Sequence, residues 1–336
     1  MKVFVTGAAG YIGSHTILEL LRAGHEVFAC DNYCNSSPEA LRRVRRLANA
    51  DFEDAEVDVR DVDGLSKIMA EFAPDAVIHF AGLKAVGVSA QMPLEYYDNN
   101  VTGTLRLLQA MDGVACRRIV FSSSATVYGE PRYLPYDEAH PLLPVNTYGR
   151  TKLMAEQVIA DWAAAAPGKS AALLRYFNPV GAHPSGEIGE DPNGIPDNLM
   201  PYIAQVAVGR RPHLSVFGDD YDTRDGTGER DFIHVVDLAR AHVAAIEFVS
   251  ENTSCEALNI GTGKAFSVME MVKGFEQASA RPIPVQFVGR RKGDLPSYYA
   301  DASKAHALLG WRAEHGLAEI CQTTWAWQSR NPDGYA

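Results

Sequence analysis

Short apolar runs alternate with longer amphipathic stretches through the first half of the chain. The runs are rich in β-branched and aromatic residues, as strands are, and the stretches between them repeat apolar positions every three to four residues, as helices do. We expect strands at 3–5, 26–30, 55–59, 76–80, 119–122 and 171–176. This alternation predicts an α/β fold, a Rossmann-type doubly wound parallel sheet covered by helices.

After residue 176 the pattern changes. Residues 179–201 are rich in Pro, Gly, Asn and Asp, as expected for a long functional loop. A helix is expected at 201–209 and a strand at 214–217, followed by a second polar loop at 218–228. We therefore predict two domains. Residues 1–176 form the larger one, and residues 177–336 form a smaller α/β domain, some segments of which can return to the first.

The first apolar run leads into three glycines, Gly7, Gly10 and Gly13, and then into a helical pattern. Glycines let the backbone approach a pyrophosphate closely, and the N–H groups at a helix start bind anions. The spacing GxxGxxG departs from the usual GxGxxG, so its position between strand and helix is what makes the motif informative. Asp31 ends the second expected strand, where a carboxylate can bind the adenosine ribose. No Lys or Arg occurs at 31–40, which favours NAD over NADP.

Composition narrows the choice of partners. The chain has 336 residues, 46% hydrophobic and 22% charged, which is ordinary for a globular protein. Its net charge of −11 argues against nucleic acid as a partner, and an anionic substrate would need a local basic cluster.

Five scattered cysteines show no metal-ligand spacing, so we expect no metal and a reducing cytosol. The sequence shows no secretory signal and no apolar stretch near the roughly 20 residues that span a bilayer. We expect a soluble cytoplasmic protein without a membrane partner.

Tyr148 and Lys152 are four residues apart and share one face if the segment is helical. A nearby ammonium group stabilises a phenolate and lowers its pKa from about 10. Ser124, which follows the apolar run 119–121, can hydrogen-bond both the phenol and a substrate hydroxyl. The trio suits oxidation of an alcohol, although a Tyr and a Lys at this spacing are also common as a plain surface pair. The glycine loop, which implies a hydride acceptor, favours catalysis.

Longer strings identify a family. They are TGAAGYIG from Thr6, HFAGLKAVG from His79, LEYYDNNVTGTLRLL from Leu94, SSSATVYG from Ser122, YGRTK from Tyr148, LLRYFNPVGAHPSG from Leu173, NLMPYIAQVAVGRR from Asn198 and GDLPSYYADASKA from Gly293. Together they resemble the extended short-chain dehydrogenase/reductase family, and within it the UDP-glucose 4-epimerases. The strings span almost the whole chain.

The resemblance implies three sets of site residues. Catalysis would fall to Ser124, Tyr148 and Lys152. NAD would contact Gly7, Gly10, Tyr11, Ile12, Gly13, Asp31, Asn32, Tyr33, Cys34, Asn35, Ser36, Asp58, Val59, Phe80, Ala81, Gly82, Leu83, Lys84, Asn99, Ser124, Tyr148, Lys152 and Phe177. A UDP-hexose would contact Ser124, Tyr148, Asn178, Asn198, Leu199, Ser215, Val216, Phe217, Arg230, Arg291, Lys292, Gly293, Asp294 and Tyr298.

It also implies a reaction, the interconversion of UDP-glucose and UDP-galactose in galactose metabolism. The Tyr148 phenolate would take the proton of the sugar 4-hydroxyl while hydride passes to NAD, which gives a 4-keto sugar. The sugar would turn and receive hydride on its other face, so NAD would stay bound and binding energy would rest mainly on UDP. Guanidinium groups such as Arg230 and Arg291 suit a diphosphate, although such charges are also common on solvated surfaces.

Three other functions remain open. A nucleotide-sugar 4,6-dehydratase needs an acid/base pair that relatives supply as Asp-Glu just after the serine or threonine, where this chain has Ala125 and Thr126. A 4-reductase or net dehydrogenase would differ in consuming cofactor. A dinucleotide-sensing regulator would lack the catalytic trio, which is present here.

Two finer expectations come from the resemblance. The bulk of Tyr298 should exclude N-acetylated sugars. The helices through 103–111 and 148–160 should form a homodimer, although their apolar faces could equally belong to the core.

Overall fold

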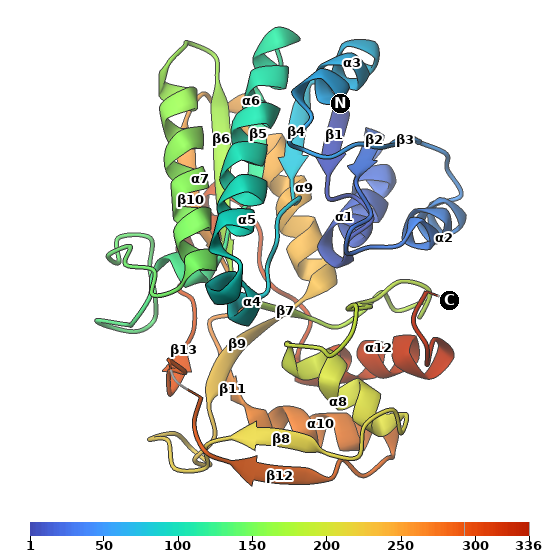
Figure 1. Cartoon of the computed structure of the whole chain (residues 1–336), viewed down its shortest axis with the longest axis vertical. Helices are drawn as coiled ribbons and strands as arrows, with labels where there is room; N and C mark the ends of the chain where they lie inside the picture. The colour runs from blue at the N-terminus through green and yellow to red at the C-terminus, as the bar shows by residue number, and fades with distance from the viewer. Residues whose placement is uncertain (292, 336) are drawn as a thin grey trace.

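The computed structural model describes residues 1–291 and 293–335, and Figure 1 shows their arrangement. The larger part is a parallel sheet with its helices. Its elements are β1 (Lys2–Thr6), α1 (Tyr11–Arg22), β2 (Glu26–Asp31), α2 (Pro38–Ala48), β3 (Glu53–Glu56), α3 (Val62–Phe72), β4 (Ala76–His79), α4 (Val86–Gln91), α5 (Pro93–Tyr97), the π-helix η1 (Asp98–Thr102), α6 (Gly103–Gly113), β5 (Arg118–Ser122), the 3₁₀ turn η2 (Ala125–Val127), α7 (Thr147–Ala164) and β6 (Ser170–Tyr176).

Seven strands of the described residues form this sheet in the order β10, β6, β5, β4, β1, β2, β3, all parallel. The strand order reverses between β1 and β4, so the loops after these strands diverge at the carboxyl edge. In such sheets ligands bind at this switch point. The predicted Rossmann-type fold is confirmed.

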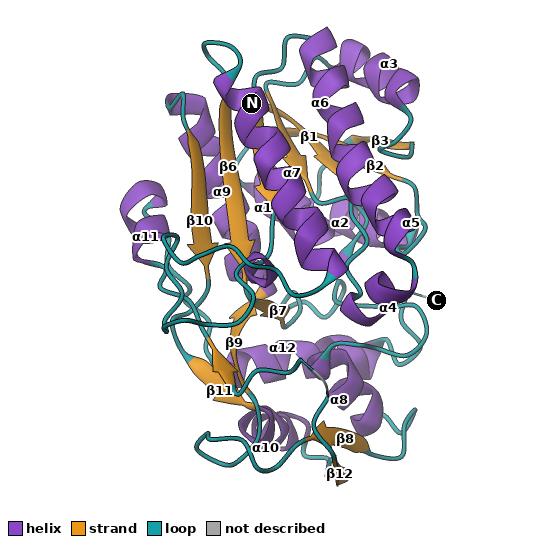
Figure 2. Ribbon diagram, turned by 60° about the vertical axis from the view of Figure 1, so that its left-hand side comes forward, coloured by secondary structure: helices purple, strands orange, loops and turns teal. Residues whose placement is uncertain are grey.

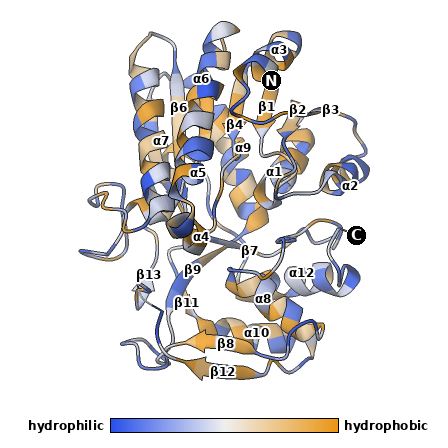
Figure 3. Cartoon of the chain, in the orientation of Figure 1, coloured by the Kyte–Doolittle hydropathy of each residue, from blue (hydrophilic) through white to orange (hydrophobic). Residues whose placement is uncertain are grey.

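Alternate side chains of β1 show why helices cover both faces. Val3 and Val5 pack with apolar residues of α1 and α9 (Val235–Glu251), whereas Phe4 packs with residues of α3, α6 and α7. Figure 2 shows α6 and α7 in front of the sheet and α1 and α9 behind it. Because both faces are covered, the central strands are hydrophobic throughout, as Figure 3 shows by their orange colour against the blue of α2.

The smaller part lies at the carboxyl edge of this sheet (Figure 1). Strand β9 (Glu229–His234) pairs with β7 (Asn178–Val180), β11 (Ala265–Ser267) and β13 (Ser297–Tyr298), and β8 (Leu214–Phe217) pairs with β12 (Val285–Val288). Three helices, α8 (Leu199–Ala207), α10 (Val268–Ser279) and α12 (Leu317–Arg330), enclose a separate apolar core with β8. Helix α11 (Ser303–Leu309) packs instead on α9, and its Ala305 belongs to the core of the larger part.

The chain does not divide cleanly at residue 176. Helix α9 packs on α1, and β10 (Cys255–Ile260) pairs with β6 at the edge of the large sheet. Residues 235–260 therefore return to the first part, the return for which the sequence interpretation left room. Contacts this distant in sequence leave no local pattern in the polar loops around 176.

Two predicted elements are displaced. The strand expected at 55–59 is β3, Glu53–Glu56, a mostly exposed edge strand, and the helix expected at 201–209 begins two residues earlier at Leu199. An edge strand with exposed side chains carries little hydrophobic pattern, which explains the wrong boundary. No helix among the described residues is long and apolar enough to cross a membrane.

Candidate active site

The glycine loop between β1 and α1 packs tightly against the loop after β4. Gly7 has φ +67°, and a Cβ there would lie 2.6 Å from the Ala81 nitrogen. A Cβ on Gly13 would lie 2.3 Å from the Gly7 oxygen. Gly10, the N-cap of α1, supplies no side-chain cap, so the first N–H groups of this 12-residue helix remain available to an anion. At Gly7 and Gly13 the sequence therefore places glycine where a side chain would not fit.

Asp31 links this loop to the chain that follows β2. Its side chain is buried, with Oδ2 accepting from the Ala9 nitrogen at 2.9 Å and Oδ1 accepting from the Tyr33 nitrogen at 2.8 Å and Ser36 Oγ at 2.9 Å. Residues 32–36 therefore lie beside the glycine loop.

Asp58, which follows β3, lies next to them because the Asn32 amide donates to its Oδ2 at 2.9 Å. The nearest described cation, Arg60, is paired with Asp58 at 2.8 Å and with Asp98 at 2.8 Å. It is thus engaged by two carboxylates, in keeping with the expected preference for a cofactor without a 2′-phosphate.

The loop at 80–84 is held by a residue that the sequence interpretation missed. Buried Asn100, in η1, accepts from the Leu83 nitrogen at 2.8 Å, donates to the Leu83 oxygen at 3.0 Å, and donates to Thr151 Oγ1 at 3.0 Å. It fixes the loop to α7, and its half-buried neighbour Asn99 was the residue expected here. The adjacent Asn-Asn pair gives no signal of which one is buried.

Helix α7 carries two of the three residues expected to be catalytic, Tyr148 and Lys152. The Asn146 side chain caps it by accepting from the Gly149 nitrogen at 2.8 Å, so Tyr148 and Lys152 do share a helix face. Both are buried, and the Lys152 ammonium donates to the Ser122 oxygen at 2.8 Å and lies 5.9 Å from the Tyr148 ring centroid. Ser124 follows β5 and caps η2, with Oγ accepting from the Thr126 nitrogen.

The electrostatics correct one expectation. Burial raises the pKa of the Tyr148 phenol well above its usual range, nearby Tyr176 raises it further, and a hydrogen bond with Ser124 opposes them. Burial also lowers the pKa of Lys152 to about 8, against the attraction of Glu156. Within the chain alone, desolvation therefore outweighs the expected effect of the lysine on the phenol.

Two further groups at the site carry no sequence motif. Tyr176, the last residue of β6, accepts from Ser122 Oγ at 2.9 Å. Behind the trio, buried Glu156 and Arg175 pair at 2.7 Å, and Glu156 also accepts from Ser123 Oγ. Only their position along the chain could have indicated them, because the ends of the strands in a parallel sheet converge on one edge.

The expected substrate residues form separate groups. In one, Tyr298 donates to Asn178 Oδ1 at 3.0 Å, and the Arg230 guanidinium lies 4.6 Å from the Tyr298 ring centroid. Phe177, from the expected cofactor set, is 6.1 Å from the same ring, so the two expected sets meet here.

In a second group the Arg291 guanidinium lies 4.6 Å from the Phe217 ring centroid and pairs with Asp294 at 3.0 Å. Ser215 is half-buried in the same strand, whereas the Val216 side chain belongs to the apolar core and leaves only its backbone for a ligand. Gly293 adjoins this group with φ +89°, and Lys292 lies outside the described residues.

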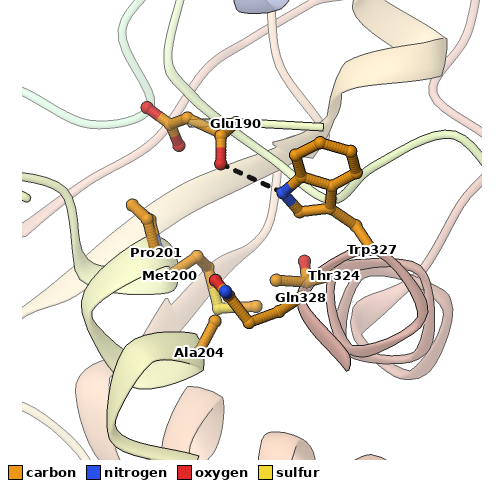
Figure 4. A pocket seen from close by; sticks show the side chains of 8 residues that line it. Glu190, Met200, Pro201, Ala204, Thr324, Trp327 and Gln328 are labelled. Atoms are coloured by element: carbon orange, nitrogen blue, oxygen red, sulfur yellow. Dashed lines mark hydrogen bonds between the residues drawn. The ribbon is translucent and has the colours of Figure 1, made fainter. Parts of the chain in front are cut away.

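Asn198 and Leu199, at the start of α8, form a third group through Glu190. The Glu190 carboxylate accepts from Asn198 at 2.9 Å and pairs with Lys84 at 3.0 Å. Glu190 is also one of the residues that line a small pocket beside α8 and α12 (Figure 4), together with Gly181, Met200, Pro201, Ala204, Thr324, Trp327 and Gln328. Glu190 therefore connects residues expected on the two sides of the site.

These residues fit a dinucleotide. The glycine loop is a cradle that a Cβ would fill, the N-terminus of α1 offers free N–H groups, and a buried carboxylate stands beside both. The catalytic trio lies on the same carboxyl edge, at the ends of β5 and the start of α7.

Comparisons with known proteins agree with this geometry. The family model described as GDP-mannose 4,6 dehydratase matches residues 4–324. The UDP-glucose 4-epimerase of Bacillus subtilis is 56% identical over 335 residues, which cover 100% of this chain and 99% of that protein.

Two solved structures share the fold over the full length. The UDP-glucose 4-epimerase of Stenotrophomonas maltophilia with bound NAD and formylated UDP-arabinopyranose has a TM-score of 0.97 and 48% identity, covering 99% of each chain. That of Bifidobacterium longum with NAD+ and UDP has a TM-score of 0.96 and 50% identity, covering 99% of this chain and 100% of the other. The chain belongs to the UDP-glucose 4-epimerases of the extended short-chain dehydrogenase/reductase family.

Proposed function

We propose that this protein interconverts UDP-glucose and UDP-galactose by epimerisation at C4, through a transient 4-keto sugar and with NAD held throughout. The observation that carries the proposal is the convergence of Ser124, Tyr148 and Lys152 on the sheet edge where the glycine loop lies. The full-length similarity to UDP-glucose 4-epimerases supports the choice of substrate.

The NAD residues are the glycine loop, Asp31 with 32–36, Asp58 with Val59, the loop 80–84, Asn99 and Phe177. When bound, NAD supplies the hydride acceptor, and its oxidised nicotinamide adds a positive charge that lowers the pKa of a neighbouring phenol. Lys84 and Asn99 would bind polar groups of the cofactor, and buried Asn100 holds their loops in place.

Tyr148 moves the proton. In the chain alone, the raised pKa keeps the Tyr148 phenol protonated. This pKa must therefore fall when a positive charge is brought next to the phenol. Ser124 hydrogen-bonds the phenol and is placed to bind the sugar 4-hydroxyl as well. Tyr148 takes the proton from the 4-hydroxyl in the first half of the turnover and returns it in the second, so one side chain acts as base and then as acid.

The nucleotide part of the substrate anchors the molecule. Arg230 and Arg291 would supply guanidinium groups for the diphosphate, supported by their positions beside Tyr298 and Phe217. The other expected contacts are Asn178, Asn198, Leu199, the backbone of 215–217, Gly293, Asp294 and Tyr298. Holding the substrate by its nucleotide leaves the hexose free to present either face to the cofactor.

A 4,6-dehydratase is the alternative that the name of the matching family model suggests. Elimination of water requires a second acid/base pair, yet the two residues after Ser124 are buried Ala125 and Thr126, whose hydroxyl donates to Ser124 Oγ at 3.0 Å. Neither side chain titrates near neutral pH, so neither can serve as the second acid or base. The reaction that remains for the keto sugar is the return of hydride.

The test is incubation of the purified protein with UDP-galactose and no added cofactor. Epimerisation gives UDP-glucose over many turnovers, because NAD is regenerated within each one. A reductase or dehydrogenase would stop after a single turnover, a dehydratase would give a 4-keto-6-deoxy sugar, and a regulator would bind NAD and leave the sugar unchanged. Any of these three results overturns the proposal.

We also propose a cytoplasmic homodimer. All five cysteines are free thiols, which suits a reducing compartment. Exposed apolar side chains gather on α4 to α7, at Val86, Val88, Met92, Leu94, Leu105 and Met154, which suits a partner surface. Sedimentation of the wild type against a Leu94→Asp/Leu105→Asp double variant tests the dimer, which should dissociate in the variant.

A further inference from the structure

Glu190 lies in a segment, residues 181–190, that follows β7 and contacts both the larger part and α12. On the first side the Tyr11 hydroxyl donates to the Gly181 oxygen at 2.6 Å, and Arg43 donates to the Glu187 oxygen at 3.0 Å. On the other side Thr323 accepts from the Ala182 nitrogen at 3.2 Å. We call residues 181–190 the crossing segment.

The end of the crossing segment is fixed by backbone and side chain separately. Trp327 Nε1 donates to the Glu190 backbone oxygen at 3.2 Å, as Figure 4 shows, and the Gly189 nitrogen donates to the Tyr335 hydroxyl at 3.2 Å. The Glu190 backbone is therefore anchored to α12 and the residues after it. Its carboxylate takes no part in these backbone contacts and binds other residues of the candidate site.

One carboxylate oxygen of Glu190, Oε1, contacts a residue of the expected cofactor set and a residue of the expected substrate set. It lies 3.0 Å from Lys84 Nζ and 2.9 Å from Asn198 Nδ2. The Glu190 side chain is only 9% exposed, whereas that of Lys84 is 51% exposed. A long, partly solvated lysine is thus held in one position by a fixed, sheltered anion.

We propose that Glu190 is a positioning residue that holds Lys84 over the cofactor and Asn198 toward the substrate, and so retains NAD between turnovers. The inference rests on the proposed function, because epimerisation needs NAD to stay bound while the sugar leaves. Glu190 belongs to neither of the two expected sets of ligand contacts. Through one carboxylate oxygen, Glu190 links Lys84 of loop 80–84 to Asn198 at the start of α8.

Two substitutions separate its two contacts. Glu190→Gln keeps an oxygen that can accept from Asn198 but removes the charge that holds Lys84. Glu190→Leu removes both. Glu187→Gln is the matched control, because Glu187 belongs to the same segment and its exposed carboxylate lies 3.6 Å from Arg46, away from Lys84.

The measurement is the exchange of bound NAD for labelled NAD in the purified holoenzyme. We expect Glu190→Gln to exchange about two- to fivefold faster than wild type, the range for a partly exposed ion pair, with an unchanged KM for UDP-galactose. Glu190→Leu should also raise KM. In a Lys84→Met background Glu190→Gln should add nothing further, since its partner is gone.

Exchange by Glu190→Gln at the wild-type rate overturns the inference, as does the same acceleration in Glu187→Gln. A drop in melting temperature with unchanged exchange would show that the carboxylate serves only the fold. The proposed function fails differently: a wild-type protein that carries no NAD, or does not epimerise, contradicts it before any variant is made.

Discussion

Tyr148 shows how far a side chain's chemistry depends on its surroundings. Its hydroxyl is buried and hydrogen-bonded to Ser124, and desolvation disfavours the phenolate more than the lysine one turn away favours it. We expect such a phenol to act as a base only when a positive charge lies beside it, as that of an oxidised nicotinamide would.

Tyr148→Phe should therefore lower kcat by about 10²- to 10⁴-fold, the usual contribution of a general acid/base, while bound NAD stays near the wild-type amount. Turnover of UDP-galactose and the NAD released on denaturation check both parts. Tyr133→Phe is the control, since it removes an exposed hydroxyl whose hydrogen-bond partner among the described residues is Asp137. A Tyr148→Phe variant with normal turnover would exclude this role.

Tyr298 should set the size of the sugar that is accepted. Its ring lies between Arg230 and Phe177, and its hydroxyl holds Asn178. Tyr298→Ser should create room for an N-acetyl group and give measurable epimerisation of UDP-N-acetylglucosamine, with a lower rate on UDP-galactose because Asn178 loses its partner. Competition between the two substrates measures the change. Equal selectivity in both proteins would place the size limit elsewhere.

At the scale of elements, the glycine loop and the loop after β4 form one packed unit. Gly7 meets the backbone of Ala81 at a distance that excludes any side chain, and Asn100 then connects the same loop to α7. The glycine loop and α7 are thus joined through loop 80–84. A disturbance at Gly7 should reach both.

Gly7→Ala should abolish stable NAD binding, because a Cβ would lie 2.6 Å from the Ala81 nitrogen and the left-handed φ of +67° adds strain. Gly24→Ala separates these effects, since Gly24 has φ +81° and nothing within 4 Å of an added Cβ. We expect Gly24→Ala to lower the melting temperature slightly and to keep its NAD. Loss of NAD in both variants would assign the effect to strain alone.

The elements also show what sequence reasoning can reach. Tyr148 and Lys152 were predictable because helix geometry fixes residues four apart, and the glycine loop was predictable because a strand and a helix flank it. Asn100, Tyr176 and Glu190 were not, since each acts through contacts between distant segments. The pKa of Tyr148 was expected to fall because sequence shows the neighbouring charge and hides the burial.

At the scale of the molecule, neutral histidines are spread through the interior. Burial lowers the pKa of His15 and His79 to about 3, of His183 and His242 to about 4, and of His234 to about 2. Their ordinary value is near 6.5. Between pH 6.5 and 4 the unfolded chain therefore binds protons that the folded chain refuses.

Stability should be fully present above pH 6.5 and fall as the pH drops toward 4, with each ring contributing up to about 1.4 kcal/mol per pH unit. Melting temperature against pH measures this slope. His242→Phe should make it shallower, because that ring lies between Phe80 and Tyr176 and its Nε2 has no hydrogen-bond partner among the described residues. If His242→Phe leaves the dependence of melting temperature on pH unchanged, groups other than His242 cause the acid sensitivity.

The crossing segment has a consequence for the order in which the protein can be made. Its supports, Trp327 and Tyr335, leave the ribosome long after Tyr11 and Lys84, and so does β10, the edge strand of the large sheet. A nascent chain can form the glycine loop early, yet the contacts of Trp327 and Tyr335 with residues 189 and 190 form only once these late residues have emerged. Cofactor captured during synthesis should exchange freely, and secure retention should begin only after Trp327 and Tyr335 have emerged.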